Sequence, residues 1–121
     1  MLSATQHAAV TSDAARPLQI LAGPGSGKTR VLTSRVAWLV RDSATPIAPE
    51  RCVVVTFTNR AANEMRARLE SMIGADRTRR LVLGTFHAVC VRFLRRWGTR
   101  LGLDPRFTIA DTDDARRLLR D

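Results

Sequence analysis

Short apolar runs alternate along the chain with longer stretches of helical periodicity. The apolar runs lie at Leu18–Ala22, Arg51–Phe57 and Leu81–Gly84, and their length and aliphatic or β-branched content are typical of buried strands. Each run is followed by apolar residues that recur every three or four positions, as on one face of an amphipathic helix. The pattern therefore predicts three successive strand–helix units.

The first predicted helix follows Lys28 and has an apolar face made of Leu32, Val36, Leu39 and Val40. The second spans Asn63–Ile73. The third is the longest, and its apolar face consists of Phe86, Val89, Cys90, Phe93, Leu94, Trp97 and Leu101. Between them, residues 42–50 indicate a surface loop because they contain Ser, Thr and two prolines, and residues 74–80 indicate a charged connection.

The end of the chain predicts two further elements. Phe107–Ile109 favours a brief strand, and Asp111 or Thr112 is expected to cap a last helix that runs through Leu119. Alternating strands and helices predict an α/β fold with a parallel sheet and helices on both faces, which is a three-layer arrangement.

A glycine-rich segment connects the first predicted strand to the first predicted helix. Its residues are Ala22, Gly23, Pro24, Gly25, Ser26, Gly27, Lys28 and Thr29. Lys28 is the only lysine of the chain, whose other 19 basic residues are arginines. The P-loop template has glycine where this chain has Ala22, so the match is to a relaxed form of that motif.

A P-loop assigns a distinct role to each part of this segment. The Lys28 ammonium reaches the β and γ phosphates, the Thr29 hydroxyl binds Mg²⁺, and the glycines let the backbone approach the phosphates. The backbone N–H groups and the positive end of the helix dipole also favour an anion there. The alternative is a glycine-rich turn that only joins a strand to a helix.

Length, composition and charge limit the class of protein. With 121 residues, of which 45% are hydrophobic, the chain suits one compact domain. It has neither an apolar stretch of 18 residues nor a signal-peptide pattern, so we expect an intracellular protein without membrane contact. Cys52 and Cys90 lie in apolar surroundings, which predicts buried thiols rather than a zinc site or a disulfide.

The net charge of +9 and the isoelectric point near 11.6 favour a polyanionic partner such as nucleic acid. Arginine richness can also follow from coding composition. On that view some arginines only solvate the surface, among them Arg77, Arg79, Arg80, Arg116, Arg117 and Arg120.

Four sequence blocks in order resemble the start of UvrD/Rep-type superfamily one DNA helicases. They are Leu2–Gln6 (the Q motif), Ala22–Thr29 (motif I), Val55–Met65 (motif Ia) and Gly84–His87 (the following block). The resemblance implies that residues 1–121 form the N-terminal part of a RecA-like, P-loop ATP-binding domain, with about residues 103–121 leading into an inserted subdomain.

The resemblance also implies roles near the nucleotide and along a single DNA strand. Gln6 is expected to recognise adenine with its carboxamide, and Arg30 to lie along the nucleotide; without the resemblance both are ordinary polar residues of exposed helices. The implied DNA-binding residues are Phe57, Thr58, Asn59, Arg60, Thr85, Phe86 and His87. The residues alone favour a core position for Phe57 and a capping or packing role for His87. Ala88 stands where these helicases usually have serine.

The chain has no segment like the acidic Walker B motif, the arginine finger or the second RecA-like domain of these helicases. We therefore expect the N-terminal piece of a larger cytoplasmic or nuclear helicase, with little ATP hydrolysis of its own. The implied cofactors are ATP and Mg²⁺, and the implied partners are single-stranded DNA and the remaining helicase domains. Two alternatives stay open: another P-loop enzyme such as a small kinase, and a non-catalytic basic module that binds nucleic acid.

Overall fold

The computed structural model describes residues 1–120 and divides into two compact units. The first unit is Met1–Val89 and the second begins at Cys90. Each unit is described by itself below, because their relative positions are not determined.

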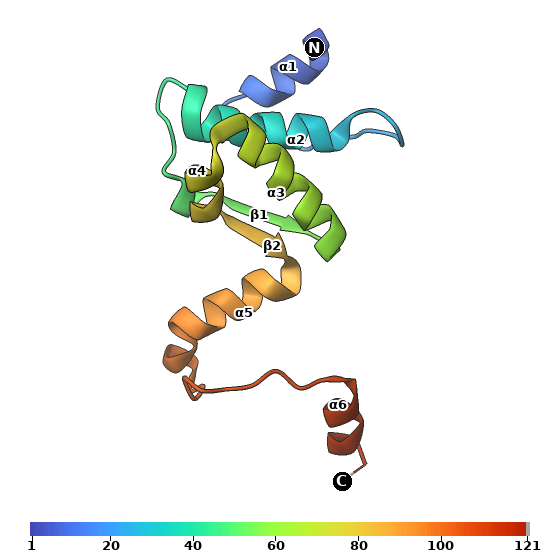
Figure 1. Ribbon diagram of the computed structural model, residues 1–121, viewed down its shortest axis with the longest axis vertical. Helices are drawn as coiled ribbons and strands as arrows, with labels where there is room; N and C mark the ends of the chain where they lie inside the picture. Colours follow the sequence, from blue (N-terminus) through green and yellow to red (C-terminus); the bar gives the residue numbers. More distant parts are fainter. Residues whose placement is uncertain (121) are drawn as a thin grey trace. The chain divides into compact units, whose positions relative to one another are not determined.

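The first unit contains most of the regular structure. In chain order its elements are α1 (Ala4–Thr11), α2 (Lys28–Ala37), the π-helical turn η1 (Trp38–Asp42), the 3-10 helix η2 (Pro49–Arg51), β1 (Val53–Thr56), α3 (Asn59–Ile73), α4 (Ala75–Arg80), β2 (Val82–Thr85) and the first residues of α5 (Phe86–Trp97). Within this unit α2 packs against both α1 and α3, and α3 lies against the two strands (Figure 1).

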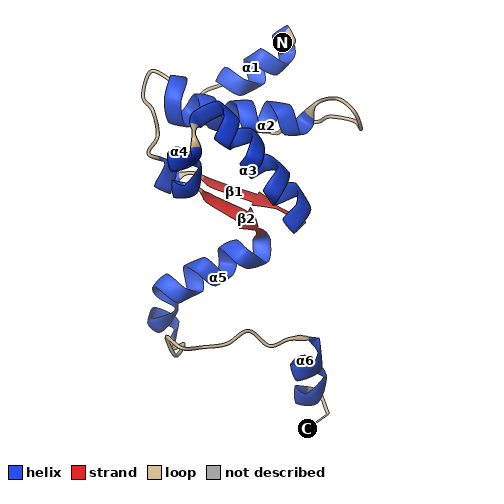
Figure 2. Cartoon of the chain, viewed as in Figure 1, coloured by secondary structure: helices blue, strands red, loops and turns tan. Residues whose placement is uncertain are grey.

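The two strands form a parallel pair with Val54 opposite Leu83 and Thr56 opposite Thr85 (Figure 2). This pairing follows from the sequence, because β-branched and aliphatic residues fit a pleated surface that is partly buried. Both strands run from α4 and η2 toward the same edge, so α3 and α5 begin next to each other. Their first residues therefore share the carboxyl edge of the sheet.

The core of the first unit lies where α2, α3 and the strands meet. It consists of Val36, Ala37, Val40, Val54, Ala62, Met65, Leu69, Ile73, Leu81 and Leu83. The buried residues of α3 are Ala62, Met65, Leu69 and Ile73, which recur at three- and four-residue spacing. Met65 and Leu69 were expected on this face, whereas Ala61 and Met72, also expected there, are only partly buried. Leu32, expected on the buried face of α2, is 39% exposed instead.

The predicted strand at Leu18–Ala22 is wrong in this structure. No strand forms there, no backbone hydrogen bond reaches this run among residues 1–120, and Leu21 is 87% exposed. A strand depends on a hydrogen-bonded neighbour, and β1 and β2 pair only with each other. The described residues consequently form a parallel sheet of two strands. The predicted parallel sheet had more strands and helices on both of its faces.

Two boundaries between elements also differ from the prediction. The charged connection at residues 74–80 contains the helix α4, on which Asp76 forms ion pairs with Arg79 and Arg80 at 3.7 and 3.6 Å. Such pairs at three- and four-residue spacing favour a helix. The helix α3 begins at Asn59 rather than Asn63, because the Thr58 hydroxyl accepts a hydrogen bond from the Ala61 N–H at 3.1 Å.

The second unit contains the rest of α5, the 3-10 helix η3 (Gly98–Leu101) and α6 (Thr112–Leu118). Asp111 caps α6 by accepting from the Asp114 N–H at 2.8 Å, which confirms one of the two predicted caps. The strand predicted at Phe107–Ile109 is absent. Phe107 instead packs under the Arg95 guanidinium, whose carbon lies 4.7 Å from the ring centre.

The two cysteines are free thiols in different surroundings. Cys52 is half-buried, and this burial raises the pKa of its thiol. Cys90 is exposed, so the expectation that it is buried is wrong. The apolar face predicted for this helix is largely exposed as well, since Val89 is the buried residue of α5 while Phe93 and Trp97 face solvent. None of the helices among residues 1–120 has the length and apolar character needed to cross a membrane.

Candidate functional site

The glycine-rich loop turns sharply before α2 because two of its glycines adopt the left-handed conformation. Gly25 has φ of 74° and Gly27 has φ of 81°, values that residues with a side chain rarely adopt. A Cβ at Gly27 would also lie 3.2 Å from the Gln6 side-chain nitrogen. The Ser26 N–H donates to the Gly23 carbonyl at 3.3 Å and closes the turn.

The first turn of α2 presents free backbone donors. Gly27 precedes the helix without a side-chain cap, and the first backbone bond runs from the Val31 N–H to the Gly27 carbonyl at 3.0 Å. The N–H groups of Lys28, Thr29 and Arg30 have no backbone partner among the described residues. Free N–H groups and the helix dipole favour an anion at this point.

Lys28 and Thr29 are free to meet such an anion. Both side chains are exposed, and neither makes a hydrogen bond or an ion pair within residues 1–120. Pro24 and Gly25 form the exposed tip of the loop before them. The structure therefore places the predicted phosphate-binding groups at a helix start, as the motif requires.

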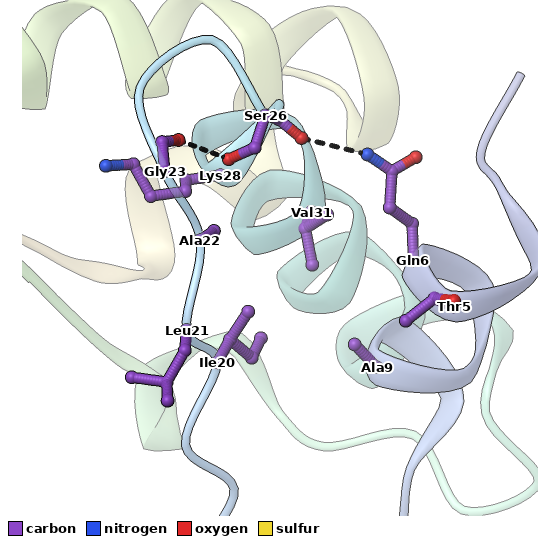
Figure 3. A pocket seen from close by; sticks show the side chains of 10 residues that line it. All are labelled: Thr5, Gln6, Ala9, Ile20, Leu21, Ala22, Gly23, Ser26, Lys28 and Val31. Carbon is purple, nitrogen blue, oxygen red and sulfur yellow. Dashed lines mark hydrogen bonds between the residues drawn. The ribbon is translucent and has the colours of Figure 1, made fainter.

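Gln6 contacts the glycine-rich loop from α1. Its side-chain N–H donates to the Ser26 carbonyl at 3.1 Å (Figure 3). Its side-chain oxygen accepts from the Ser3 N–H at 2.9 Å. The second bond is half of a capping box at the start of α1. Gln6 thus joins the first helix to the loop, a contact that the sequence does not reveal.

A cavity of about 320 Å³ lies between α1, the loop and α2 (Figure 3). Its lining residues are Thr5, Gln6, Ala9, Ile20, Leu21, Ala22, Gly23, Ser26, Lys28 and Val31. Apolar walls with a few polar groups are typical of a small-molecule site. Among residues 1–120, no carboxylate lines this cavity.

Five of the lining residues were not predicted: Thr5, Ala9, Ile20, Leu21 and Val31. Thr5 and Ala9 could have been found from the sequence, because they lie four positions apart, on one face of the helix that also carries Gln6. Arg30 does not line this cavity. It lines a second hollow between α2 and α3, together with Arg68.

An aromatic pair lies at the carboxyl edge of the sheet. The Phe57 and Phe86 ring centres are 5.3 Å apart, and the rings are tilted by 44°. Phe57 is 90% exposed and Phe86 is 47% exposed, so the core position that the residues alone favoured for Phe57 is wrong. The pairing of Thr56 with Thr85 brings the two rings together, because each ring follows directly after one of these residues.

The other predicted DNA-binding residues surround this pair. Thr58 caps α3, and the Thr85 hydroxyl accepts from the Ala88 N–H at 3.2 Å at the start of α5. Arg60 and Glu64 form an exposed ion pair at 3.4 Å. Asn59 and His87 are exposed, and Thr85 rather than His87 caps the helix.

Comparisons with known proteins match nearly the whole chain. The family model for the UvrD/REP helicase N-terminal domain matches residues 2–121. An "ATP-dependent DNA helicase PcrA" of Leuconostoc citreum is 50% identical over 104 residues, which cover 86% of this chain and 14% of that protein. An "ATP-dependent DNA helicase srs2" of Schizosaccharomyces pombe is 45% identical over 102 residues, which cover 84% of this chain and 11% of that protein. The chain thus spans about a seventh or less of the length of these relatives.

Proposed function

Because the chain belongs to the UvrD/REP helicase N-terminal domain family, we propose that it is the ATP-binding segment of an ATP-dependent helicase that moves along single-stranded DNA. The observation that carries this proposal is the start of α2, where Lys28 and free backbone N–H groups follow a glycine turn beside a cavity. The names of the relatives, which are DNA helicases, give the reaction class.

The residues at the loop fit the triphosphate of a nucleotide. The left-handed Gly25 and Gly27 keep the loop tip free of Cβ atoms, so phosphate oxygens can approach the backbone. The Lys28 ammonium supplies a compact positive charge without a competing carboxylate in the lining. The Thr29 hydroxyl is the residue that would hold Mg²⁺, a cation that prefers oxygen ligands and phosphates together.

The adenine side of the nucleotide is assigned to the cavity lined by Gln6. A carboxamide offers a donor and an acceptor side by side, and the apolar walls at Ala9 and Val31 suit the flat face of a base. In the observed conformation both ends of the Gln6 carboxamide already have protein partners. The second N–H of the carboxamide and the second lone pair of its oxygen remain open for adenine.

The DNA strand is assigned to the carboxyl edge of the sheet. Exposed aromatic rings stack on unpaired bases without reading sequence, and Phe57 with Phe86 offers two such rings side by side. The hydroxyls of Thr58 and Thr85 cap helices, and helix starts hold phosphates through backbone N–H groups. In open α/β sheets ligands bind at this edge.

The two-stranded sheet is part of a larger three-layer RecA-like domain in this proposal. Val53 is 50% exposed on β1 although strands of parallel sheets are normally buried on both faces. ATP hydrolysis also needs carboxylates for Mg²⁺ and for the attacking water. The residues resemble no acidic Walker B block that would supply these carboxylates, so we assign binding rather than hydrolysis to this segment.

The decisive experiment is a Lys28→Ala variant titrated with ATP and Mg²⁺. Removing the ammonium should weaken ATP binding at least tenfold, while the unfolding temperature stays the same because the side chain is exposed. Unchanged affinity would refute the phosphate-binding role of Lys28.

Arg16→Ala is the matched control for this titration. Arg16 is exposed and outside the cavity, so its removal lowers the net charge equally without touching the loop. A second measurement uses the longer protein that contains this segment. If that protein hydrolyses ATP in response to DNA and the Lys28→Ala variant does not, the protein is a motor. A basic module that only binds nucleic acid would show no hydrolysis. A kinase would require a phosphoryl acceptor instead.

A further inference from the structure

The second unit carries two neighbouring rows of side chains along α5 and η3. The basic row consists of Arg92, Arg96 and Arg100. The aromatic row begins one residue later and consists of Phe93, Trp97 and Leu101. Within α5 the members of each row are four residues apart, a spacing that places side chains on the same side of a helix. All three arginines are exposed.

No carboxylate within residues 1–120 neutralises the basic row. The segment from Phe86 to Leu101 contains neither Asp nor Glu, and the side chains of the basic row form no ion pair or hydrogen bond with the described residues. The carboxylates described in the second unit are engaged elsewhere, since they pair with Arg106 and Arg116 or cap α6. Exposed cations without a counterion favour a polyanionic ligand.

The aromatic row presents exposed ring surface beside these cations. The Phe93 and Trp97 ring centres are 5.5 Å apart, and both side chains are exposed. The Arg96 guanidinium carbon lies 5.2 Å from the Trp97 ring centre, so the two rows are in contact. A hollow of about 270 Å³ lies along the aromatic row, and its lining residues are Phe93, Leu94, Trp97, Gly98, Arg100 and Leu101.

We propose that this face of α5 and η3 is a second binding site for single-stranded nucleic acid. The basic row holds phosphates, because guanidinium groups form charge-assisted hydrogen bonds with phosphate oxygens. The aromatic row and its hollow receive bases, because exposed rings stack on unpaired bases without reading sequence. A duplex keeps its bases stacked on one another, so it would contact the basic row and leave the aromatic row without a partner. A single strand offers ligands to both rows.

This site goes beyond the proposed function, which assigns the DNA strand to Phe57 and Phe86 at the sheet edge. The two surfaces have no residue in common. Each can therefore fail without the other, and the experiments below separate them.

The two tryptophans of the chain allow a local measurement. Trp38 lies in η1 and Trp97 in α5, so in a Trp38→Phe protein the tryptophan fluorescence reports on α5 alone. A short oligothymidylate should quench this fluorescence as a base stacks on the ring, whereas a duplex of the same length should leave it nearly unchanged. The quenching should persist in the Phe57→Ala background, because that change removes a ring from the sheet edge only.

Variants of the two rows are compared in the Phe57→Ala background by fluorescence anisotropy of a labelled oligothymidylate. Arg96→Gln should reduce the slope of log affinity against log salt by about 0.7, as expected for one single-strand phosphate contact. Trp97→Leu should weaken binding about tenfold because the ring is lost, while Trp97→Phe should retain most of it. Arg106→Gln is the control, since Arg106 is exposed in the same unit and outside both rows; its salt slope should stay unchanged.

Several outcomes would overturn this proposal. They are an absence of Trp97 quenching, equal quenching by duplex and single strand, or equal losses in Arg106→Gln and Arg96→Gln. If polyglutamate displaces the labelled strand as well as unlabelled oligothymidylate does, the face binds an acidic protein segment instead. If Phe57→Ala weakens binding but Trp97 is not quenched, the sheet-edge site stands and this second site does not. Circular dichroism of every variant separates a loss of folding from a loss of binding.

Discussion

Phe57 and Phe86 expose aromatic surface to solvent at the carboxyl edge of the sheet. Their rings contact each other at 5.3 Å, but Phe57 remains 90% exposed. Large aromatic side chains that stay exposed in pairs mark interaction sites more often than stability elements. The pair is therefore the residue-scale feature that most strongly supports a base-stacking role.

Replacement of Phe57 by alanine tests this role directly. Phe57→Ala should weaken binding of single-stranded DNA by about 1–3 kcal/mol, because one stacking surface is lost. The thermal unfolding temperature should hardly change, since the side chain buries little area in the fold. Fluorescence anisotropy with a labelled oligonucleotide measures the first quantity and circular dichroism the second.

Phe107→Ala serves as the comparison, because Phe107 packs under Arg95 in the second unit and not at the sheet edge. If the Phe57→Ala protein loses stability but retains its DNA affinity, the base-stacking role is contradicted and Phe57 has a structural role.

At the scale of elements, one side chain fixes α1 against α2. The Arg35 guanidinium donates to the carbonyls of Ala9, Val10 and Ser12, each at 3.0 Å, and to the Ser12 hydroxyl at 2.9 Å. These carbonyls are at the end of α1, where the helix leaves acceptors unpaired and favours a cation. Because α1 carries Gln6, Arg35 also holds the cavity wall in place.

Arg35→Ala should lower the free energy of unfolding by about 1–3 kcal/mol, because half-buried acceptors lose their donor. Hydrogen exchange of the α1 amides should accelerate more than that of α3. Arg51→Ala removes an exposed arginine whose side chain has no hydrogen bond or ion pair within residues 1–120. This change should neither lower the free energy of unfolding nor accelerate exchange in α1. Equal exchange rates in α1 before and after the Arg35 change would contradict this docking role.

An ion pair between Glu50 and Arg80 joins η2 to α4 just before the two strands. The hydrogen bond from Arg80 lowers the pKa of the Glu50 carboxyl from its ordinary value of 4.5. A lowered pKa stabilises the fold above the unfolded-state value and loses that contribution as pH falls through the folded-state value.

Glu50→Gln should therefore lower the unfolding temperature at pH 7. The difference in unfolding temperature between the two proteins should shrink as the pH falls below 4.5. The effect should be small and should shrink with added salt, since both side chains are exposed. Thermal melts of both proteins at several pH values provide the measurement. A difference that stays constant across this range would rule out the carboxylate as its source.

At the scale of the whole molecule, stability is concentrated in the first unit. Leu69 is fully buried between α2, α3 and the strands, at 0% exposure. Leu69→Ala should reduce the free energy of unfolding by about 2–5 kcal/mol through lost apolar contact and the cavity that remains.

Leu101→Ala provides the matched control for this deletion, since Leu101 is exposed in η3. Its effect should stay within about 0.5 kcal/mol. Urea denaturation of both variants measures the two free energies, and a similar loss in each would show that the core is not confined to the first unit.

Much of this organisation could be predicted from neighbouring residues. The helices α2, α3 and α5 followed from apolar periodicity, and the Asp111 cap from its local chemistry. The strand expected at Leu18–Ala22 failed because apolar content alone does not supply a hydrogen-bonded neighbour. Helix α4 was missed because its ion pairs bring charged residues together only once the helix exists.

The sequence by itself determined the glycine turn and the lysine at the start of α2, because these depend on residues that are adjacent in the chain. It also determined the family, because the order of the motifs along the chain is a property of the sequence alone. Tertiary structure alone decided that Phe57 meets Phe86, that Gln6 holds the Ser26 carbonyl and that Arg30 shares a hollow with Arg68. Each of those contacts joins distant segments, and strand register and helix packing fix which side chains meet.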